Sequence, residues 1–155
     1  MVIIHLILGL CWYWQNTYSA PEIWLREVNK IRSQGCICGN RYYPPVQPVQ
    51  WNVKLAHLAQ KHSEDMAIKG YFHHVSPSGN NLVDRLNQAG IGWINAAENI
   101  FLAKGFKPTP SEVVLNWKNS PGHCQNLLHP LVTDMGIGEY QGHYTQMFIR
   151  PKNGN

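Results

Sequence analysis

The sequence predicts an α+β fold, and two kinds of segment support this prediction. Apolar residues recur at helical spacing at about 21–33, 52–70 and 109–119, each time behind a residue suited to cap a helix. By contrast, the segment 132–150 is rich in β-forming residues on both sides of Gln141-Gly142, which predicts a tight β-hairpin. The chain has 155 residues, the size of one domain with a substantial core.

The first helix begins behind a capping signal. Ser19-Ala20-Pro21-Glu22 has the spacing of a capping box, with proline close to the first helical position. We predict a helix from about Pro21 to Ser33 that ends at Gly35. The segment 39–50 contains three prolines, and we predict an extended loop there because proline removes backbone donors.

The second helix carries one apolar stripe. Asn52 is its expected N-cap, and Gly70 is its expected end. His62 lies on the stripe, and a single histidine facing a core is more often a packing residue than a ligand. The segment 71–79 follows, and its Ser-Pro and Ser-Gly pairs predict a loop.

The middle of the chain alternates a helix, a strand and another helix. We predict a short helix at 81–89 and an apolar strand at 96–103. The next helix begins with a second capping box at 109–112 and buries Trp117. It breaks at Ser120-Pro121-Gly122.

Glu98 is the residue on which the functional prediction depends. It is flanked by small and apolar residues, whereas the other eight Asp and Glu residues lie beside polar residues, turns or helix ends. Because burying a carboxylate without partners costs several kcal/mol, Glu98 either faces solvent or meets donors from elsewhere. The eight histidines are the obvious cationic partners, and backbone amides are the alternative.

Charge and hydropathy exclude some classes of protein. The net charge is +4 and no run of Lys or Arg exceeds two, so we expect no nucleic-acid partner. The apolar segment 2–14 is too short for a transmembrane helix and is typical of a secretory signal. Leu8-Gly9-Leu10-Cys11 is close to a lipoprotein cleavage box. We therefore assign 1–20 to an export or lipoprotein segment; a helix packed on the domain is the alternative.

The cysteines agree with export. If Cys11 is removed with a signal segment or carries a lipid, Cys36, Cys38 and Cys124 remain. Three cysteines can form one disulfide, so one thiol stays unpaired or forms an intermolecular bridge. Cys36 and Cys38 are one residue too close for a CxxC zinc or redox pair. A structural disulfide from this pair to Cys124 fits an oxidising compartment.

Five blocks follow one another along the chain: Phe72–Gly79, Asp84-Arg85, Ala97–Ile100, Trp117–Asn126 and Gly142–Gln146. In this order they resemble the CAP superfamily, which comprises cysteine-rich secretory proteins, antigen 5 and plant pathogenesis-related proteins. The details resemble the bacterial branch and cover 21–150, leaving 151–155 as a tail. The resemblance implies a three-layer α-β-α sandwich around a central antiparallel sheet.

The resemblance also implies a site. The family cavity gathers two histidines and two glutamates, in some members around zinc or another divalent cation; His74, Glu98 and His143 match three of these positions. Ser120 stands where the family has its second glutamate, and the bacterial branch commonly supplies a later histidine, here His123. Three histidines and one glutamate form a plausible metal-binding set.

Two further expectations come from the same resemblance. Ser120 and Asn99 are expected to line the cavity behind the metal ligands. The family position of the cysteines implies a disulfide between Cys38 and Cys124.

The resemblance implies a class of function more than a reaction. We predict a secreted, periplasmic or cell-surface binding module, monomeric, with an extracellular ligand such as a lipid or sterol. The alternative is a metal-dependent, protease-like hydrolase in which Glu98 is the general base for a metal-bound water.

Overall fold

The computed structural model describes residues 20–152, so the export segment expected at 1–20 lies outside the described residues except for Ala20. Its central sheet has the strand order β3-β5-β6-β4. The long neighbours are antiparallel, whereas the two-residue β3 runs parallel to β5. The strands are β3 (Gln50–Trp51), β4 (Trp93–Leu102), β5 (Asp134–Tyr140) and β6 (His143–Pro151).

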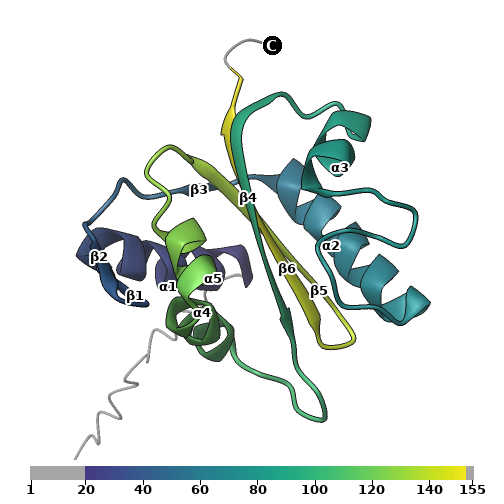
Figure 1. Ribbon diagram of the computed structural model, residues 1–155, viewed down its shortest axis with the longest axis horizontal. Coiled ribbons are helices and arrows are strands. Elements are labelled where there is room, and N and C mark those ends of the chain that lie inside the picture. Colours follow the sequence, from purple (N-terminus) through teal and green to yellow (C-terminus); the bar gives the residue numbers. More distant parts are fainter. Residues whose placement is uncertain (1–19, 153–155) are drawn as a thin grey trace, which may run out of the picture.

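Helices cover both faces of this sheet (Figure 1). On one face lie α2 (Val53–Lys69) and α3 (Leu82–Gln88). On the other lie α1 (Ala20–Gln34), α4 (Pro110–Asn119) and α5 (Pro121–Leu127). The predicted α+β class and its helix-sheet-helix layering are confirmed. Among the described residues, no helix combines the length and apolar character that crossing a membrane requires.

The alternation of side chains along β6 divides the core in two. Met147 packs with Leu55 of α2 and Leu86 of α3, whereas its neighbour Phe148 packs with Trp117 of α4 on the opposite face. Successive strand residues point to opposite faces, so one strand supplies both cores. Glu98 pairs with Met147 in the β4–β6 register and therefore faces the α2 layer.

The predicted caps of α2 and α4 are present, whereas Ser19 of the capping box predicted for the first helix lies outside the described residues. The Asn52 side chain accepts from the Leu55 amide, and Gly70 ends α2 in the left-handed conformation. Thr109 and Glu112 form the predicted capping box of α4. These signals act within one helical turn, which is why they could be read from the sequence.

Two glycines let α2 approach the sheet closely. A Cβ at Gly136 would overlap the backbone of Leu55 and Ala56, and a Cβ at Gly138 would overlap the backbone of Gln60. The helix therefore lies directly on β5 at these points, with no side chain between the two backbones.

The β5–β6 hairpin turns at Gln141 and Gly142, as predicted. Both residues have positive φ, 46° and 78°, as a type I′ turn requires. Gln141 is the single non-glycine residue with positive φ in the described part of the chain.

The prediction of a continuous loop over 39–50 was wrong at its beginning and its end. β1 (Cys36–Cys38) and β2 (Arg41–Tyr43) form a small hairpin, and β3 begins at Gln50. Gly39 has a φ of 65°, which permits the turn between β1 and β2. The prolines of the segment come after the hairpin, where they leave its ladder intact.

The break predicted after α4 is also the start of α5. Ser120 ends α4, and Pro121 occupies the first turn of α5, where a missing N–H has no cost. α5 carries His123 and Cys124. Cys124 forms the predicted disulfide with Cys38 across a sequence separation of 86 residues. The chain-entropy model gives such a bond about 4 kcal/mol.

Candidate functional site

Glu98 is buried in β4 with cationic and polar partners at both oxygens. The Arg85 Nη2 donates to Oε2 over 2.6 Å, and His74 Nδ1 lies 2.9 Å from Oε1. Glu98 itself is 7% exposed. Of the two alternatives left by the sequence, the side-chain partners, rather than backbone amides, compensate the carboxylate.

Arg85 ties the loop at 71–79 to this carboxylate. Its Nη1 donates to the carbonyl oxygens of His74 and Asn80 while Nη2 holds Glu98. Its partnership with Glu98 was not predicted. The sequence did contain a sign that Arg85 is buried, because Arg85 lies three residues after Leu82 and beside Leu86, on the inward side of a short capped helix.

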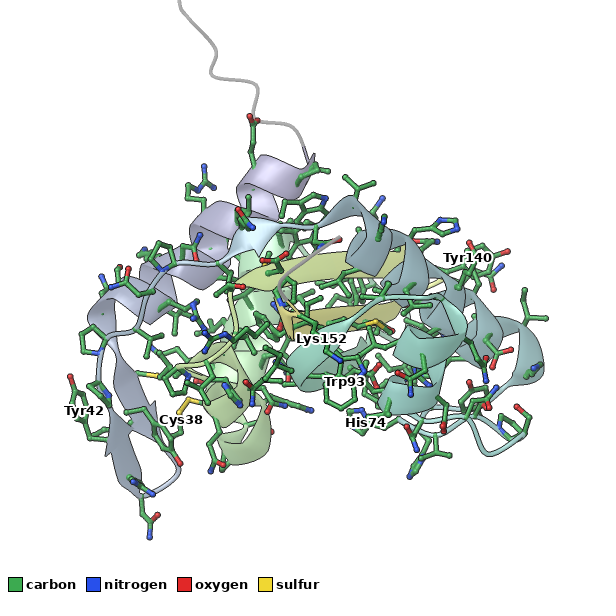
Figure 2. The ribbon with its side chains drawn as sticks, turned by 90° about the horizontal axis from the view of Figure 1, so that it is seen from above. Cys38, Tyr42, His74, Trp93, Tyr140 and Lys152 are labelled. Carbon is green, nitrogen blue, oxygen red and sulfur yellow. A yellow bond between two sulfur atoms is a disulfide. The ribbon has the colours of Figure 1, made fainter. Side chains whose placement is uncertain are left out.

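His74 presents one ring nitrogen to Glu98 and leaves the other free. Since a carboxylate only accepts, His74 Nδ1 donates, which leaves Nε2 as the ring nitrogen that a ligand can use when the imidazole is neutral. The side chain is 47% exposed. Figure 2 shows His74 at the periphery of the molecule.

His62 brings a third ring to Glu98. It is buried, as its position on the apolar stripe predicted, but its Nε2 lies 3.9 Å from Glu98 Oε1 and has no hydrogen-bond partner. Burial lowers the pKa of His62 to about 4, against the raising effect of the Glu98 charge. His62 is therefore neutral at pH 7.

The depressed pKa of His62 makes the stability depend on pH. The folded state resists protonation that the unfolded state accepts at the ordinary pKa of about 6.5, so stability falls as the pH drops from about 6.5 towards 4. Between pH 7 and 4.5, we expect wild type to lose about 2 kcal/mol more unfolding free energy than His62→Gln. Urea denaturation at both pH values measures this, with the exposed His57→Gln as control. Equal losses in wild type and His62→Gln would contradict it.

A buried amide network lies on the opposite face of β4. Asn99 Nδ2 donates to the Gln146 side chain and to the carbonyl oxygen of His123, and Asn126 donates to Asn99 and to the carbonyl oxygen of Glu98. Asn99 thus connects to the backbone of the residue that bears the predicted His123 ligand. Asn126 and Gln146 were not predicted as members of this network, although both lie in the recognised blocks.

His123 is half-buried, and its Nδ1 is buried with no hydrogen-bond partner. Burial lowers its pKa, and the charge of His74 lowers it further. Since buried polar atoms almost always have a partner, Nδ1 marks a position suited to a water, an ion or a ligand atom.

Of the remaining predicted residues, His143 lies farther along the sheet from Glu98, and Ser120 lies at the junction of α4 and α5. His143 pairs with Leu102, four residues along β6 from the partner of Glu98, and its Nδ1 lies 3.2 Å from the Gln141 carbonyl oxygen. About four strand residues span roughly 13 Å. Ser120 ends α4, and its carbonyl accepts from the Cys124 amide.

The four predicted ligands do not form one compact coordination sphere as placed. Among the described residues, one group of three or more His, Cys, Asp or Glu side chains has ligand atoms within 4.8 Å of one another, and it consists of Cys36, Cys38 and Cys124. Two of those sulfurs are bonded to each other, so they offer no thiolate to a metal. Metal binding by His74, Glu98, His143 and His123 stays a prediction.

A polar cavity of about 320 Å³ adjoins the cluster and shares His62 and Arg85 with it. Three positively charged side chains, Lys61, Lys69 and Arg85, and one negatively charged side chain, Asp65, line it. Serine and amide groups complete its wall: Ser76, Ser78, Asn80 and Gln88.

Comparison with known proteins agrees with this architecture. The sequence model of a family described as "CAP: Cysteine-rich secretory protein family" matches residues 25–149. The protein YkwD of Bacillus subtilis (strain 168) is 42% identical over 106 residues, 67% of this chain and 40% of YkwD. The membrane protein YlbC of the same strain is 38% identical over 102 residues, 66% of this chain. The chain spans 40% and 29% of the lengths of these two relatives.

Solved structures are similar as well. An extracellular protein of Bacillus anthracis str. Ames that contains an SCP domain has 37% identity and a TM-score of 0.59, over 68% of this chain and 34% of that one. An outer surface protein of Borrelia burgdorferi has 17% identity and a TM-score of 0.60, over 69% of this chain and 80% of that one. At 17% identity, the similarity to the Borrelia burgdorferi protein concerns the fold alone.

Proposed function

Because the chain belongs to the CAP family of cysteine-rich secretory proteins, we propose that it is an extracellular binding module whose ligand is held at His74 and the adjoining cavity. The observation that carries this proposal is that both carboxylate oxygens of Glu98 are engaged, one by Arg85 and one by His74. A general base needs a carboxylate oxygen that can take a proton from water. The arrangement therefore favours a binding module over the alternative hydrolase.

Two observations support the extracellular placement. The disulfide between Cys38 and Cys124 is of the kind that persists in oxidising compartments. In addition, the similar Bacillus anthracis structure is that of an extracellular protein. A secreted or surface-bound chain agrees with both.

The lining of the cavity points to a polar, anionic ligand rather than a lipid or sterol. Lys69 is paired with Asp65, and Arg85 is paired with Glu98. Since His62 is neutral, Lys61 gives the cavity one excess positive charge, which favours a carboxylate or similar group. Lipid sites are lined mainly by apolar side chains, whereas serine and amide groups line much of this wall.

Calorimetric titration tests the ligand class, with citrate as an anionic probe and palmitate and cholesterol as apolar probes. We expect citrate to bind wild type and to bind Lys61→Ala on the order of tenfold more weakly, because one charge of the cavity is removed. Lys54→Ala is the matched control, since Lys54 lies on the same helix outside this cavity. Binding of cholesterol or palmitate without citrate would reverse the assignment of ligand class.

A divalent cation is the second candidate for the same site, favoured by the unpartnered His123 Nδ1. His74 Nε2 and His123 are suitable zinc ligands, and a carboxylate that orients a ligating histidine through its other nitrogen is the usual support for such a ligand. In this assignment Glu98 orients His74. A bound cation would supply positive charge for an anionic ligand.

Zinc titration tests this candidate. We expect one zinc ion to bind, and binding to weaken about 10–100-fold in His74→Ala and in His123→Ala. His57→Ala is the control for adventitious binding by an exposed histidine, and Cys36→Ser in every variant removes the free thiol as a competing ligand. Equal affinities in all variants would contradict the assignment.

A further inference from the structure

The three cysteines of the described chain lie together where β1 meets α5. Cys38 and Cys124 form the disulfide, and Cys36 is a free thiol. Cys36 Sγ lies 3.4 Å from Cys124 Sγ, and all three sulfur atoms lie within 4.8 Å of one another. A free thiol beside a disulfide sulfur is the reactant pair of thiol–disulfide exchange.

The β1 strand explains why both of its cysteines can serve Cys124. Cys36 and Cys38 are two residues apart, so their side chains point to the same face of the strand. Ile37 between them points the other way and is 66% exposed. Cys38 belongs to the same β1–β2 hairpin as Tyr42, and both are labelled in Figure 2. Cys36 Sγ can therefore approach Cys124 Sγ from the same face of the strand as Cys38.

The three sulfurs differ in their access to solvent. Cys38 is 3% exposed and Cys124 is fully buried, whereas Cys36 is half-buried. Both sulfurs of the disulfide are thus shielded from an external thiol. Burial raises the pKa of the Cys36 thiol, and the positive charge of Lys118 opposes this shift.

We propose that Cys36, Cys38 and Cys124 form a thiol–disulfide exchange site, in which Cys36 gives an external dithiol access to the buried disulfide. The Cys36 thiol loses its proton to solvent, and its sulfur attacks Cys124 Sγ. The Cys36–Cys124 bond forms, the Cys38–Cys124 bond breaks, and the Cys38 thiolate takes up a proton. This first step is an isomerisation and needs no oxidant or reductant.

The second step uses the dithiol. One thiolate of the dithiol attacks the more accessible Cys36 Sγ, which gives a mixed disulfide and releases Cys124 as a thiolate. The second thiol of the reductant then displaces Cys36 and closes its own disulfide. In sum, the dithiol loses two electrons and the protein disulfide gains them. The partner class is a small dithiol or a dithiol-bearing oxidoreductase.

The rate of reduction tests the role of Cys36. Folded protein is treated with dithiothreitol, quenched with acid and N-ethylmaleimide, and its thiols are counted by intact mass. All proteins carry Cys11→Ser, so the count reports the three sulfurs. We expect Cys36→Ser to be reduced on the order of tenfold more slowly than the parent, because the accessible entry point is lost. Ile37→Ser, which alters the same strand and keeps all sulfurs, should match the parent. Equal rates for the parent and Cys36→Ser overturn the proposal.

The alternative bond is tested directly in Cys38→Ser. After oxidation with oxidised dithiothreitol, non-reducing peptide mapping should find the Cys36–Cys124 disulfide. Free thiols at both positions in the folded variant overturn the proposal. If Cys38→Ser does not fold, the reduction rates decide, because Cys36→Ser retains the native disulfide.

Discussion

Replacing Glu98 with alanine is expected to lower the free energy of unfolding by about 3–5 kcal/mol, since it leaves a buried arginine without its carboxylate. Arg85 has a side-chain exposure of 10%, and it forms an ion pair with Glu98 over 2.6 Å. The loss should exceed that expected from the few buried atoms that the substitution removes.

Urea denaturation of three variants separates charge from shape at this position. Glu98→Gln keeps the side-chain volume and one accepting oxygen but replaces the other by a donating NH2, so its stability should fall between wild type and Glu98→Ala. Glu64→Ala removes the same charge from α2, where the carboxylate bonds Gln60 within its own helix, and should cost less than about 1 kcal/mol. A loss in Glu98→Ala no larger than in Glu64→Ala would refute the role given to the Arg85 pair.

Trp117→Ala is expected to cost about 3–5 kcal/mol and to unfold much of the protein at 37 °C. Trp117 is fully buried in α4, contacts the ring of Trp24, and donates from Nε1 to the Ile100 carbonyl oxygen over 3.1 Å. The alanine leaves both a cavity and an unsatisfied carbonyl in the strand that carries Glu98.

Thermal denaturation followed by circular dichroism measures this effect. Leu115→Ala on the same helix is the control, because Leu115 is 51% exposed and should change the melting temperature little. A melting temperature of Trp117→Ala within a few degrees of wild type would show that the helix is not a main support of the core.

Features that depend on neighbours in sequence could be predicted. The caps at Asn52 and Thr109 and the turn at Gln141 act over two to four residues, and each was read correctly. The β1–β2 hairpin was missed although Gly39 marks its turn, because the prolines that follow suggested an extended loop. Its strands have three residues each, too few for a periodic pattern.

Contacts between distant segments were harder to predict. Glu98 needed a partner on energetic grounds, but Arg85 reaches it through the packing of α3 on β4. Arg32 is a more extreme case. It is fully buried, and its guanidinium donates to carbonyl oxygens that include those of Gln47 and Leu127. Nothing near Arg32 in the sequence distinguishes it from a solvated helix charge, because its partners are backbone groups 15 and 95 residues away.

The contact between α2 and the two glycines of β5 bears on how this site can change during evolution. At Gly136 and Gly138, the helix that carries His62 rests on backbone atoms, so its height above the sheet does not depend on the size of any side chain there. The outward residues of α2, such as Lys61, can therefore be exchanged while the ring of His62 keeps its place beside Glu98. Ligand preference can diversify at the rim of the cavity, whereas the spacing inside it is inherited with the two glycines.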